Sequence, residues 1–159
     1  MLDAAFWDDE DERFTDADWD HAVGGTHFVL DLDGLIACHA SVVERELHVD
    51  GRPFRTGYVE AVATAPERQG QGLGTAVMRE VTRYVEEGFE LGALGTGVQG
   101  FYERLGWRIW IGPSSVRTGD RERRTPDDDG YIMVLLAPAS AGLDLRAGIS
   151  CEWRSGDVW

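Results

Sequence analysis

Residues 58–77 have the sequence YVEAVATAPERQGQGLGTAV, and this stretch decides how the rest of the chain can be arranged. Residues 58–64 have the composition of a strand, which Pro66 ends. A loop with glycines at positions 70, 72 and 74 then opens a helix. A strand that leads through glycines into a helix often holds a phosphate, because unpaired backbone N–H groups and the positive end of the helix converge there. The stretch therefore predicts a phosphate-binding loop.

Upstream of this loop the sequence predicts an antiparallel meander. Runs rich in strand-forming residues alternate with Asp-Gly pairs, in the order 27–32, Asp33-Gly34, 35–49, Asp50-Gly51 and 54–64. Asp-Gly between apolar segments is a strong hairpin signal, since a type I′ turn needs positive φ at both central residues. A short helix over residues 16–23, ended by a Gly-Gly pair, is predicted before the meander.

Downstream of the loop, helices and strands alternate. The pattern predicts helices over 73–87 and 98–105, and strands over 91–94, 107–111 and 131–137. Residues 112–130 are rich in turn residues and are predicted as a loop, and residues 149–153 as an edge strand. A β-α-β-α-β order after a meander indicates an α/β class, an α+β mixed sheet with helices on its faces, in a single domain over residues 1–159.

The charge balance limits the partners. The formal net charge is −14, from 29 acidic and 15 basic residues. Such a field repels nucleic acid and anionic membranes and attracts polycations, so no nucleic-acid partner and no membrane association are expected. Cys38 and Cys151 lack disulfide or metal spacing, which favours a reducing, cytoplasmic setting. The histidines show no metal-binding spacing, so no metal site is predicted.

Two nucleotide-binding motifs can be excluded for the glycine loop. A P-loop requires a lysine, and the sequence contains none. A dinucleotide fingerprint needs Gly-x-Gly-x-x-Gly/Ala, but the frame from Gly70 ends on Thr75 and the frame from Gly72 ends on Val77. The loop also follows a meander rather than opening a βαβ unit, so a different phosphate ligand is expected.

The pattern Gln69-x-x-Gly72-x-Gly74 before a helix resembles the signature of the GCN5-related N-acetyltransferases. In that family the loop wraps the pyrophosphate of acetyl coenzyme A, and glycine allows the phosphates to approach the backbone N–H groups closely. A second match, FYERLGW over residues 101–107, resembles the family's Phe-Tyr-x-x-x-Gly-Phe element. Together the two motifs imply the acetyltransferase fold and acetyl-CoA as the cofactor.

A closer resemblance, to the aminoglycoside 2′-N-acetyltransferase branch, covers nearly the whole chain. It includes RTPDDDG over residues 124–130 and CEWRSGDVW over residues 151–159. Two departures stand out. Only a remnant of the first helix is expected at residues 2–7, so the usual first strand is expected to be absent, through a truncated start or otherwise. Gly95 stands where a serine is expected, so a substrate hydrogen bond is expected to be lost there.

The resemblance implies a direct attack of the substrate amine on acetyl-CoA. It assigns main-chain contacts with the pantetheine arm to Ala61, Val62 and Thr64, and the polarising N–H to Val62. Glu60 is implied as the base and Tyr102 as the acid, although a strand Glu can simply face outward and a helical Tyr is often a core residue. The residues implied to hold the cofactor's phosphates are Arg68, Gln69, Gly70, Gly72, Gly74 and Thr75.

A polycationic aminoglycoside requires a pocket lined by carboxylates. The matching positions are Asp18, Glu60, Asp128, Asp157 and the α-carboxylate of Trp159. A solvated turn at residues 127–129 and a Trp159 that only packs on a neighbour remain alternatives. So do transfer to another polyamine or protein amine, and a non-catalytic relative that binds an aminoglycoside or coenzyme A. A homodimer is one of the oligomeric states that the sequence leaves open.

Overall fold

The meander predicted from the Asp-Gly pairs is confirmed in the computed structural model, which describes residues 16–159. Its strands are β1 (Thr26–Leu32), β2 (Leu35–Val49) and β3 (Arg52–Thr64). Both turns have positive φ at both central residues, with 57° at Asp33, 80° at Gly34, 47° at Asp50 and 80° at Gly51. This is the backbone that a type I′ turn requires, so the local turn chemistry fixes the register of the central strands.

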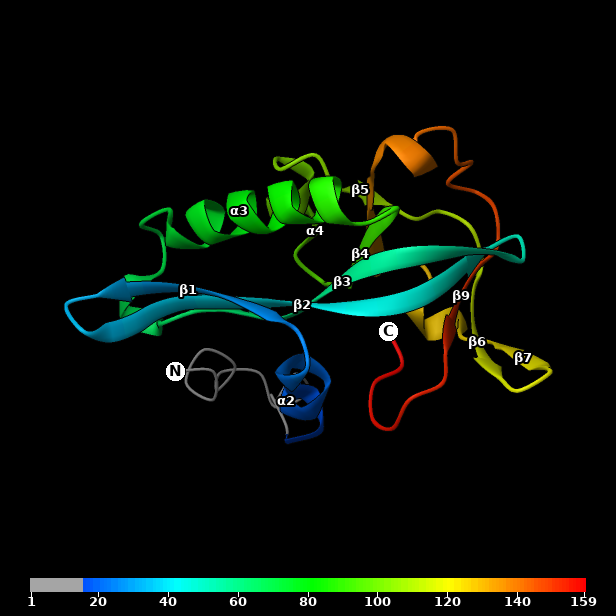
Figure 1. The fold of residues 1–159 in the computed structure, drawn as a ribbon, viewed down its shortest axis with the longest axis horizontal. Helices are drawn as coiled ribbons and strands as arrows, with labels where there is room; N and C mark the ends of the chain where they lie inside the picture. Colours follow the sequence, from blue (N-terminus) through cyan, green and yellow to red (C-terminus); the bar gives the residue numbers. More distant parts are fainter. Residues whose placement is uncertain (1–15) are drawn as a thin grey trace.

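The other elements extend this meander into one mixed sheet. The helices are α2 (Asp16–Val23), α3 (Leu73–Gly88) and α4 (Gln99–Glu103), with 3-10 turns η1 (Pro66–Arg68), η2 (Pro126–Asp128) and η3 (Pro138–Ser140). The further strands are β4 (Leu91–Gly95), β5 (Arg108–Ile109), β6 (Ser114–Thr118), β7 (Arg121–Arg124), β8 (Ile132–Leu136) and β9 (Ile149–Glu152). The sheet order is β5-β8-β4-β3-β2-β9-β6-β7, with β1 also on β2 (Figure 1). The mixed α/β class predicted from the element order is confirmed.

The two faces of the sheet carry different cores. Helix α3 covers one face through Val77, Met78, Val81 and Val85, which recur at helical spacing and pack with Val59 and Tyr102. The opposite face packs Tyr58 against Cys151 and Trp159 near the end of the chain. Figure 1 shows α3 on one side of the meander, and α2 with the chain's last residues on the other. Neighbouring residues of β3 therefore face different surroundings.

Strands β3 and β4 stop pairing halfway along β3. Their parallel pairing covers only three residue pairs, from Thr56 with Leu91 to Tyr58 with Ala93. Beyond Tyr58, β3 continues to Thr64 beside β2, while β4 pairs with β8 on its other side. The sheet therefore opens along residues 59–64, the strand half of the stretch that the glycine loop follows.

Two sequence-based predictions about the second half of the chain are wrong. Residues 112–130 are not all loop, because β6 and β7 form an antiparallel hairpin there. All four residues of β7 are exposed, so it lacks the alternating apolar pattern that marks a strand. Strand β9 is not an edge strand, since it lies between β2 and β6. The helix and strand predicted over 98–105 and 107–111 are present but shorter.

The expected remnant helix at residues 2–7, and the missing strand before it, lie outside the described residues. Within the described part of the chain, no helix has the length and apolar character needed to cross a membrane.

The turn after β7 is held against β6 by one carboxylate. Asp129 accepts hydrogen bonds from the backbone N–H and the hydroxyl of Ser114, both at 2.8 Å, and pairs with Arg124 at 2.6 Å. The hydrogen bond from Arg124 is the main reason why the pKa of Asp129 lies well below its ordinary value. Asp129 thus fixes the turn that carries Asp128.

A stability measurement tests this role of Asp129. A carboxyl whose pKa is lowered in the folded state contributes stability above its unfolded pKa of about 3.9, and this contribution is lost as the pH falls through the folded-state value. We therefore expect Asp129→Asn to lower the free energy of unfolding most near pH 7, with the gap to the wild type closing below about pH 4. Asp127→Asn, at an exposed position of the same turn, is the control. A gap that stays constant down to pH 3 contradicts the role.

Candidate active site at the opening between β3 and β4

The glycine loop begins helix α3 with a left-handed residue. Gly70 has φ of 72°, and Gly72, the N-cap of α3, has φ of 80°. A Cβ at either position would meet no atom of the described chain within 4 Å, so the positive φ is what demands glycine. No side chain caps the helix, and its first turn contains no acidic residue. The first N–H groups of α3 therefore meet the requirement for holding an anion.

The loop is packed tightly against the end of β3. A Cβ on Gly74 would lie 3.3 Å from Oγ1 of Thr64 and 3.7 Å from the ring of Phe101. The side-chain amide of Gln69 donates to the carbonyl oxygen of Thr64 at 3.4 Å. Gly74 thus allows the close approach, and Gln69 closes the loop onto the strand. The structure brings these predicted cofactor residues together.

The half-buried Arg68 and Thr75 flank the same loop. The backbone N–H of Arg68 donates to Ala65 at 2.8 Å, while its guanidinium has no acidic partner among the described residues. Thr75 lies in the first turn of α3. A free guanidinium beside an uncapped helix N-terminus adds to the local positive potential in an otherwise acidic protein.

A β-bulge follows Glu60, which the sequence pattern gave no reason to expect. The register of β2 on β3 shifts between His39 and Ser41, and Ala61 has φ of 51°. Residues other than glycine rarely adopt this left-handed backbone, and bulges often occur next to active sites. The carbonyl oxygen of Ala61 accepts a hydrogen bond from Nδ1 of His39 at 2.8 Å. Val62, the next residue, is half-buried.

Glu60 faces the side of the sheet that carries the chain's last residues. Its side chain is 14% exposed and pairs with Nη1 of Arg154 at 2.5 Å. Burial raises the pKa of the Glu60 carboxyl above its ordinary value, and the Arg154 guanidinium opposes this rise. Arg154 also donates to the main-chain oxygens of Asp157 at 2.7 Å and Trp159 at 3.4 Å. Glu60 is therefore no outward-facing strand residue but is tied to the chain's last segment.

Acidic groups converge beside this segment. Burial raises the pKa of Asp128, and the nearby Asp157 adds to the effect. The indole N–H of the buried Trp159 donates to Thr125 at 3.0 Å, and its backbone N–H donates to Asp157 at 3.2 Å. The carboxyl carbon of Trp159 would lie 3.7 Å from a Cβ on Gly95, which is ordinary contact distance. Asp128, Asp157 and Trp159 therefore lie together near the end of β4.

Asp18 lies within α2, and its side chain belongs to the part of the chain whose placement is not described. Helix α2 itself is tied to the last segment, because Nε2 of His21 bonds the carbonyl oxygen of Ser155 at 2.8 Å. Figure 1 shows this helix on the face of the meander opposite α3.

Tyr102 lies on the other face of the sheet, under α3. It is 6% exposed, its ring makes edge contacts with Phe101 and Trp107, and burial raises its pKa to about 12. Its hydroxyl has no hydrogen-bond partner among the described residues. Tyr102 and Glu60 thus lie on opposite faces of the sheet. One bound substrate can reach both side chains only through an opening between strands.

Two residues near Glu60 were missed by the sequence reasoning. Arg154 stands in the matched C-terminal motif, and that position was the available signal. Tyr58 is two residues before Glu60 and shares its face, and its buried hydroxyl has no partner among the described residues. The guanidinium carbons of Arg45 and Arg154 lie 4.6 and 5.5 Å from the centroid of its ring.

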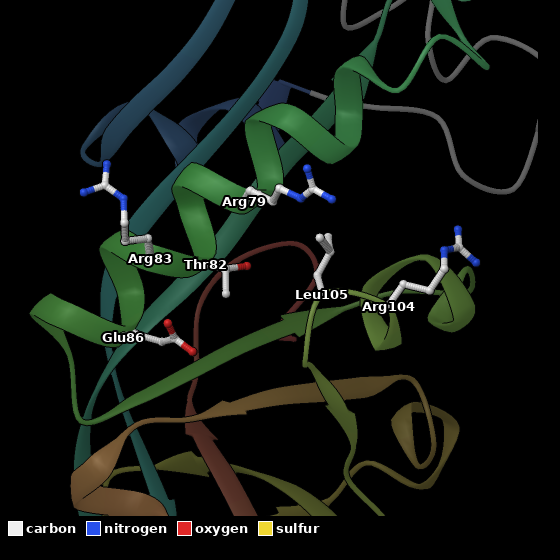
Figure 2. A pocket seen from close by; sticks show the side chains of 6 residues that line it. All are labelled: Arg79, Thr82, Arg83, Glu86, Arg104 and Leu105. Carbon is white, nitrogen blue, oxygen red and sulfur yellow. The ribbon is translucent and has the colours of Figure 1, made fainter.

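Two surface pockets on the described part of the chain lie elsewhere. One of about 400 Å³ is bordered by Arg79, Thr82, Arg83, Glu86, Arg104 and Leu105, and Figure 2 shows α3 contributing the first four of these and the turn after α4 the other two. The second, of about 520 Å³, is bordered by Glu44, Arg45, Glu46, Pro53, Arg55, Glu90 and Glu152. Neither lining includes a predicted site residue. The candidate site is therefore an opening between strands rather than one of these pockets.

Comparison with known proteins identifies the family of the chain. A family model described as an acetyltransferase (GNAT) domain matches residues 1–110. The aminoglycoside 2′-N-acetyltransferase of Mycolicibacterium fortuitum is 45% identical over 150 residues, which cover 92% of this chain and 77% of that protein.

Solved structures show the same fold at low identity. A GNAT family acetyltransferase of Brucella melitensis in complex with acetyl-CoA has a TM-score of 0.60 and 18% identity, over 96% of this chain and 84% of that one. YhbS of Escherichia coli in complex with CoA has a TM-score of 0.54 and 18% identity, over 78% and 63%. Eis1 of Mycobacterium abscessus, with a TM-score of 0.50 and 20% identity, is much longer, since the match covers 57% of this chain and 24% of Eis1.

A family model that matches residues 1–110 and a relative 45% identical over most of both chains agree with the fold and with the glycine loop that opens α3. The chain belongs to the GNAT acetyltransferases.

Proposed function

We propose that this protein transfers an acetyl group from acetyl-CoA to the 2′-amino group of an aminoglycoside. The observation that carries the proposal is the pairing of two unlike surfaces at one opening of the sheet. An uncapped helix N-terminus suited to an anionic cofactor closes the end of β3, while Glu60, Asp128 and Asp157 gather on the face suited to a polycation. The aminoglycoside 2′-N-acetyltransferase that is 45% identical supports this substrate class.

The cofactor is proposed to bind along the opening. Gly70, Gly72 and Gly74, with Gln69 and Thr75, would place backbone N–H groups of the loop on the pyrophosphate, and Arg68 would add a positive charge. The pantetheine arm would then run along residues 61–64, where no strand of the described chain pairs with β3 on the β4 side. The carbonyl oxygen of Ala61 accepts a hydrogen bond from His39, and the N–H of Val62 in the same peptide group is the proposed donor to the thioester.

The chemistry requires three proton or charge movements, and each has a candidate group. Glu60, directly or through water, would take a proton from the substrate ammonium, so that the neutral amine can attack the thioester carbonyl carbon. The N–H of Val62 would stabilise the oxygen that becomes negative when this C–N bond forms. The C–S bond would then break, and Tyr102 would protonate the departing thiolate and be reprotonated, through water, by the surplus proton of the newly bonded nitrogen. With its pKa raised to about 12, Tyr102 is protonated at neutral pH.

The ion pair between Glu60 and Arg154 gives the substrate amine a place to enter. A substrate ammonium carries the same charge as the guanidinium and can replace it on the carboxylate. Asp128, Asp157, the carboxyl group of Trp159 and Asp18 are proposed to bind the remaining ammonium groups. Burial is the main cause of the raised pKa of Asp128 and the nearby carboxylate of Asp157 adds to it, so a bound ammonium group would stabilise the ionised form of Asp128.

The setting is proposed to be the cytoplasm, with residues 1–159 acting as one domain and without a nucleic-acid partner. Cys38 and Cys151 are free thiols and both are buried, which is compatible with a reducing compartment. The net charge of −14 favours a cationic small molecule over nucleic acid. A homodimer is compatible with this proposal but is not required by it.

Substrate preference is the direct test. We expect thiol release from acetyl-CoA with an aminoglycoside that carries a 2′-amine, and none with a matched compound that carries a 2′-hydroxyl. Mass spectrometry of the product should place the acetyl group on the 2′-nitrogen. Equal activity with both compounds would contradict 2′ specificity, and activity with neither would favour another amine substrate or a non-catalytic binding role.

The pH profile tests Glu60 as the base. Arg154→Gln removes the charge that opposes the raised pKa of Glu60, so the acidic limb of kcat/KM should move to higher pH. Arg154→Lys keeps the positive charge and should leave the limb close to its wild-type position. An acidic limb that is identical in wild type and Arg154→Gln would remove Glu60 from the proton transfer.

A single hydroxyl deletion tests Tyr102 as the acid. We expect Tyr102→Phe to lower kcat by about 100-fold, because general acid catalysis typically contributes 10²–10⁴ in rate. The dissociation constant for acetyl-CoA, measured by calorimetry, should change little, since the phenylalanine ring fills the same space. Tyr84→Phe on the exposed face of α3 is the matched control. Unchanged turnover in Tyr102→Phe would exclude the residue from the mechanism.

A further inference from the structure

A pair of histidines lies behind the bulge of β3, outside the proposed chemistry. His39 of β2 is 5% exposed, and its Nε2 lies 2.9 Å from Nδ1 of His27 on β1. Trp19 of α2 packs on both rings, with centroid distances of 5.8 Å to His27 and 5.9 Å to His39. Three elements therefore meet to hold the imidazole of His39 in one orientation.

The hydrogen bonds define which ring nitrogens carry protons. The oxygen of Ala61 can only accept, so Nδ1 of His39, 2.8 Å away, must donate. In a neutral His39 the other nitrogen, Nε2, is then an acceptor, and Nδ1 of His27 donates to it. The chain of donors runs from His27 through His39 to the carbonyl oxygen of Ala61.

The carbonyl of Ala61 and the N–H of Val62 belong to the same peptide group. No cis peptide bond occurs in the described chain, so these two groups point in opposite directions. The carbonyl points at His39 on β2, and the N–H therefore points away from β2. On that side no described strand pairs with β3 beyond Tyr58, because its pairing with β4 ends there.

We propose that His39, held in its tautomer by His27, is a positioning residue that fixes the Val62 N–H toward the thioester carbonyl. The hydrogen bond at Ala61 holds the left-handed backbone at φ of 51°, which turns the peptide group outward. It also polarises the peptide, because a hydrogen bond accepted by C=O strengthens the bond that the attached N–H donates. This inference rests on the proposed function, since it assigns Val62 as the donor.

Substitutions of His39 separate the hydrogen bond from the shape of the side chain. In His39→Asn the side-chain amide nitrogen stands at the position of Nδ1 and can still donate to Ala61. In His39→Leu a side chain of comparable reach has no donor. We expect kcat of His39→Leu to fall by about 10- to 100-fold, somewhat less than the loss of an oxyanion donor itself. The KM for acetyl-CoA should stay within about twofold, because the glycine loop supplies phosphate binding.

The asparagine variant should recover most of the lost kcat. His27→Ala should reduce kcat only several-fold, because it removes the hydrogen bond that holds the His39 ring but leaves the His39 donor to Ala61 in place. His48→Leu, on the same strand and bonded to Glu46, is the control for a histidine loss. Full turnover in His39→Leu overturns the proposal. So does an asparagine variant as slow as the leucine variant, since ring shape rather than the donor would then matter.

A second measurement needs no aminoglycoside. In amide NMR spectra, acetyl-CoA should move the Val62 N–H proton downfield in the wild type and in His39→Asn, and much less in His39→Leu. This shift with no acetyl transfer to any aminoglycoside would refute the proposed function and keep the positioning role. Acetyl transfer with a Val62 shift that is independent of His39 would keep the proposed function and refute the positioning role. If acetyl-CoA does not shift the Val62 N–H proton of the folded wild type, the positioning role is wrong.

Discussion

The site depends on one constraint, which is that β3 must leave β4 before it ends. Backbone N–H and C=O groups that lose a partner strand are costly unless something else bonds them. Here the meander keeps β3 paired with β2, and the carbonyl oxygen of Ala61 in the bulge accepts a hydrogen bond from His39. After β3, the glycine loop leads the chain into α3. Apart from the bulge, residues 59–64 therefore keep their pairing with β2, while no strand of the described chain pairs with them on the other side, where the cofactor is proposed to bind.

The proposed site must bind a polycationic substrate and an anionic cofactor close to each other. A net charge of −14 favours a polycation, yet the proposed cofactor is itself an anion. In the proposed site the two demands are met on different faces of the sheet. Carboxylates gather with the last segment of the chain, while the loop offers backbone N–H groups and Arg68. Backbone dipoles suit this task because they bind phosphate without adding a countercharge that would repel the aminoglycoside.

The parts of the fold and site that could be predicted are those encoded locally. The Asp-Gly turns, the glycine loop and the period of α3 each follow from a few neighbouring residues, and the structure contains all of them. The bulge was not predictable, because Val59-Glu60-Ala61-Val62 looks like any strand and the hydrogen bond that makes it comes from His39. The pairing of Glu60 with Arg154 joins residues 94 positions apart, which no spacing rule covers.

The place of β9 was unpredictable for the same reason, and it also has a consequence for how the chain folds. The β6–β7 hairpin joins the rest of the sheet through β9, which follows the hairpin in the sequence. The central meander can form early from local turns, whereas the hairpin must wait for a non-local strand to insert between it and β2. Such contacts close large loops and are slow to form. The part of the candidate site formed by Asp128, Asp157 and Trp159 should therefore be assembled late in folding, after the glycine loop is in place.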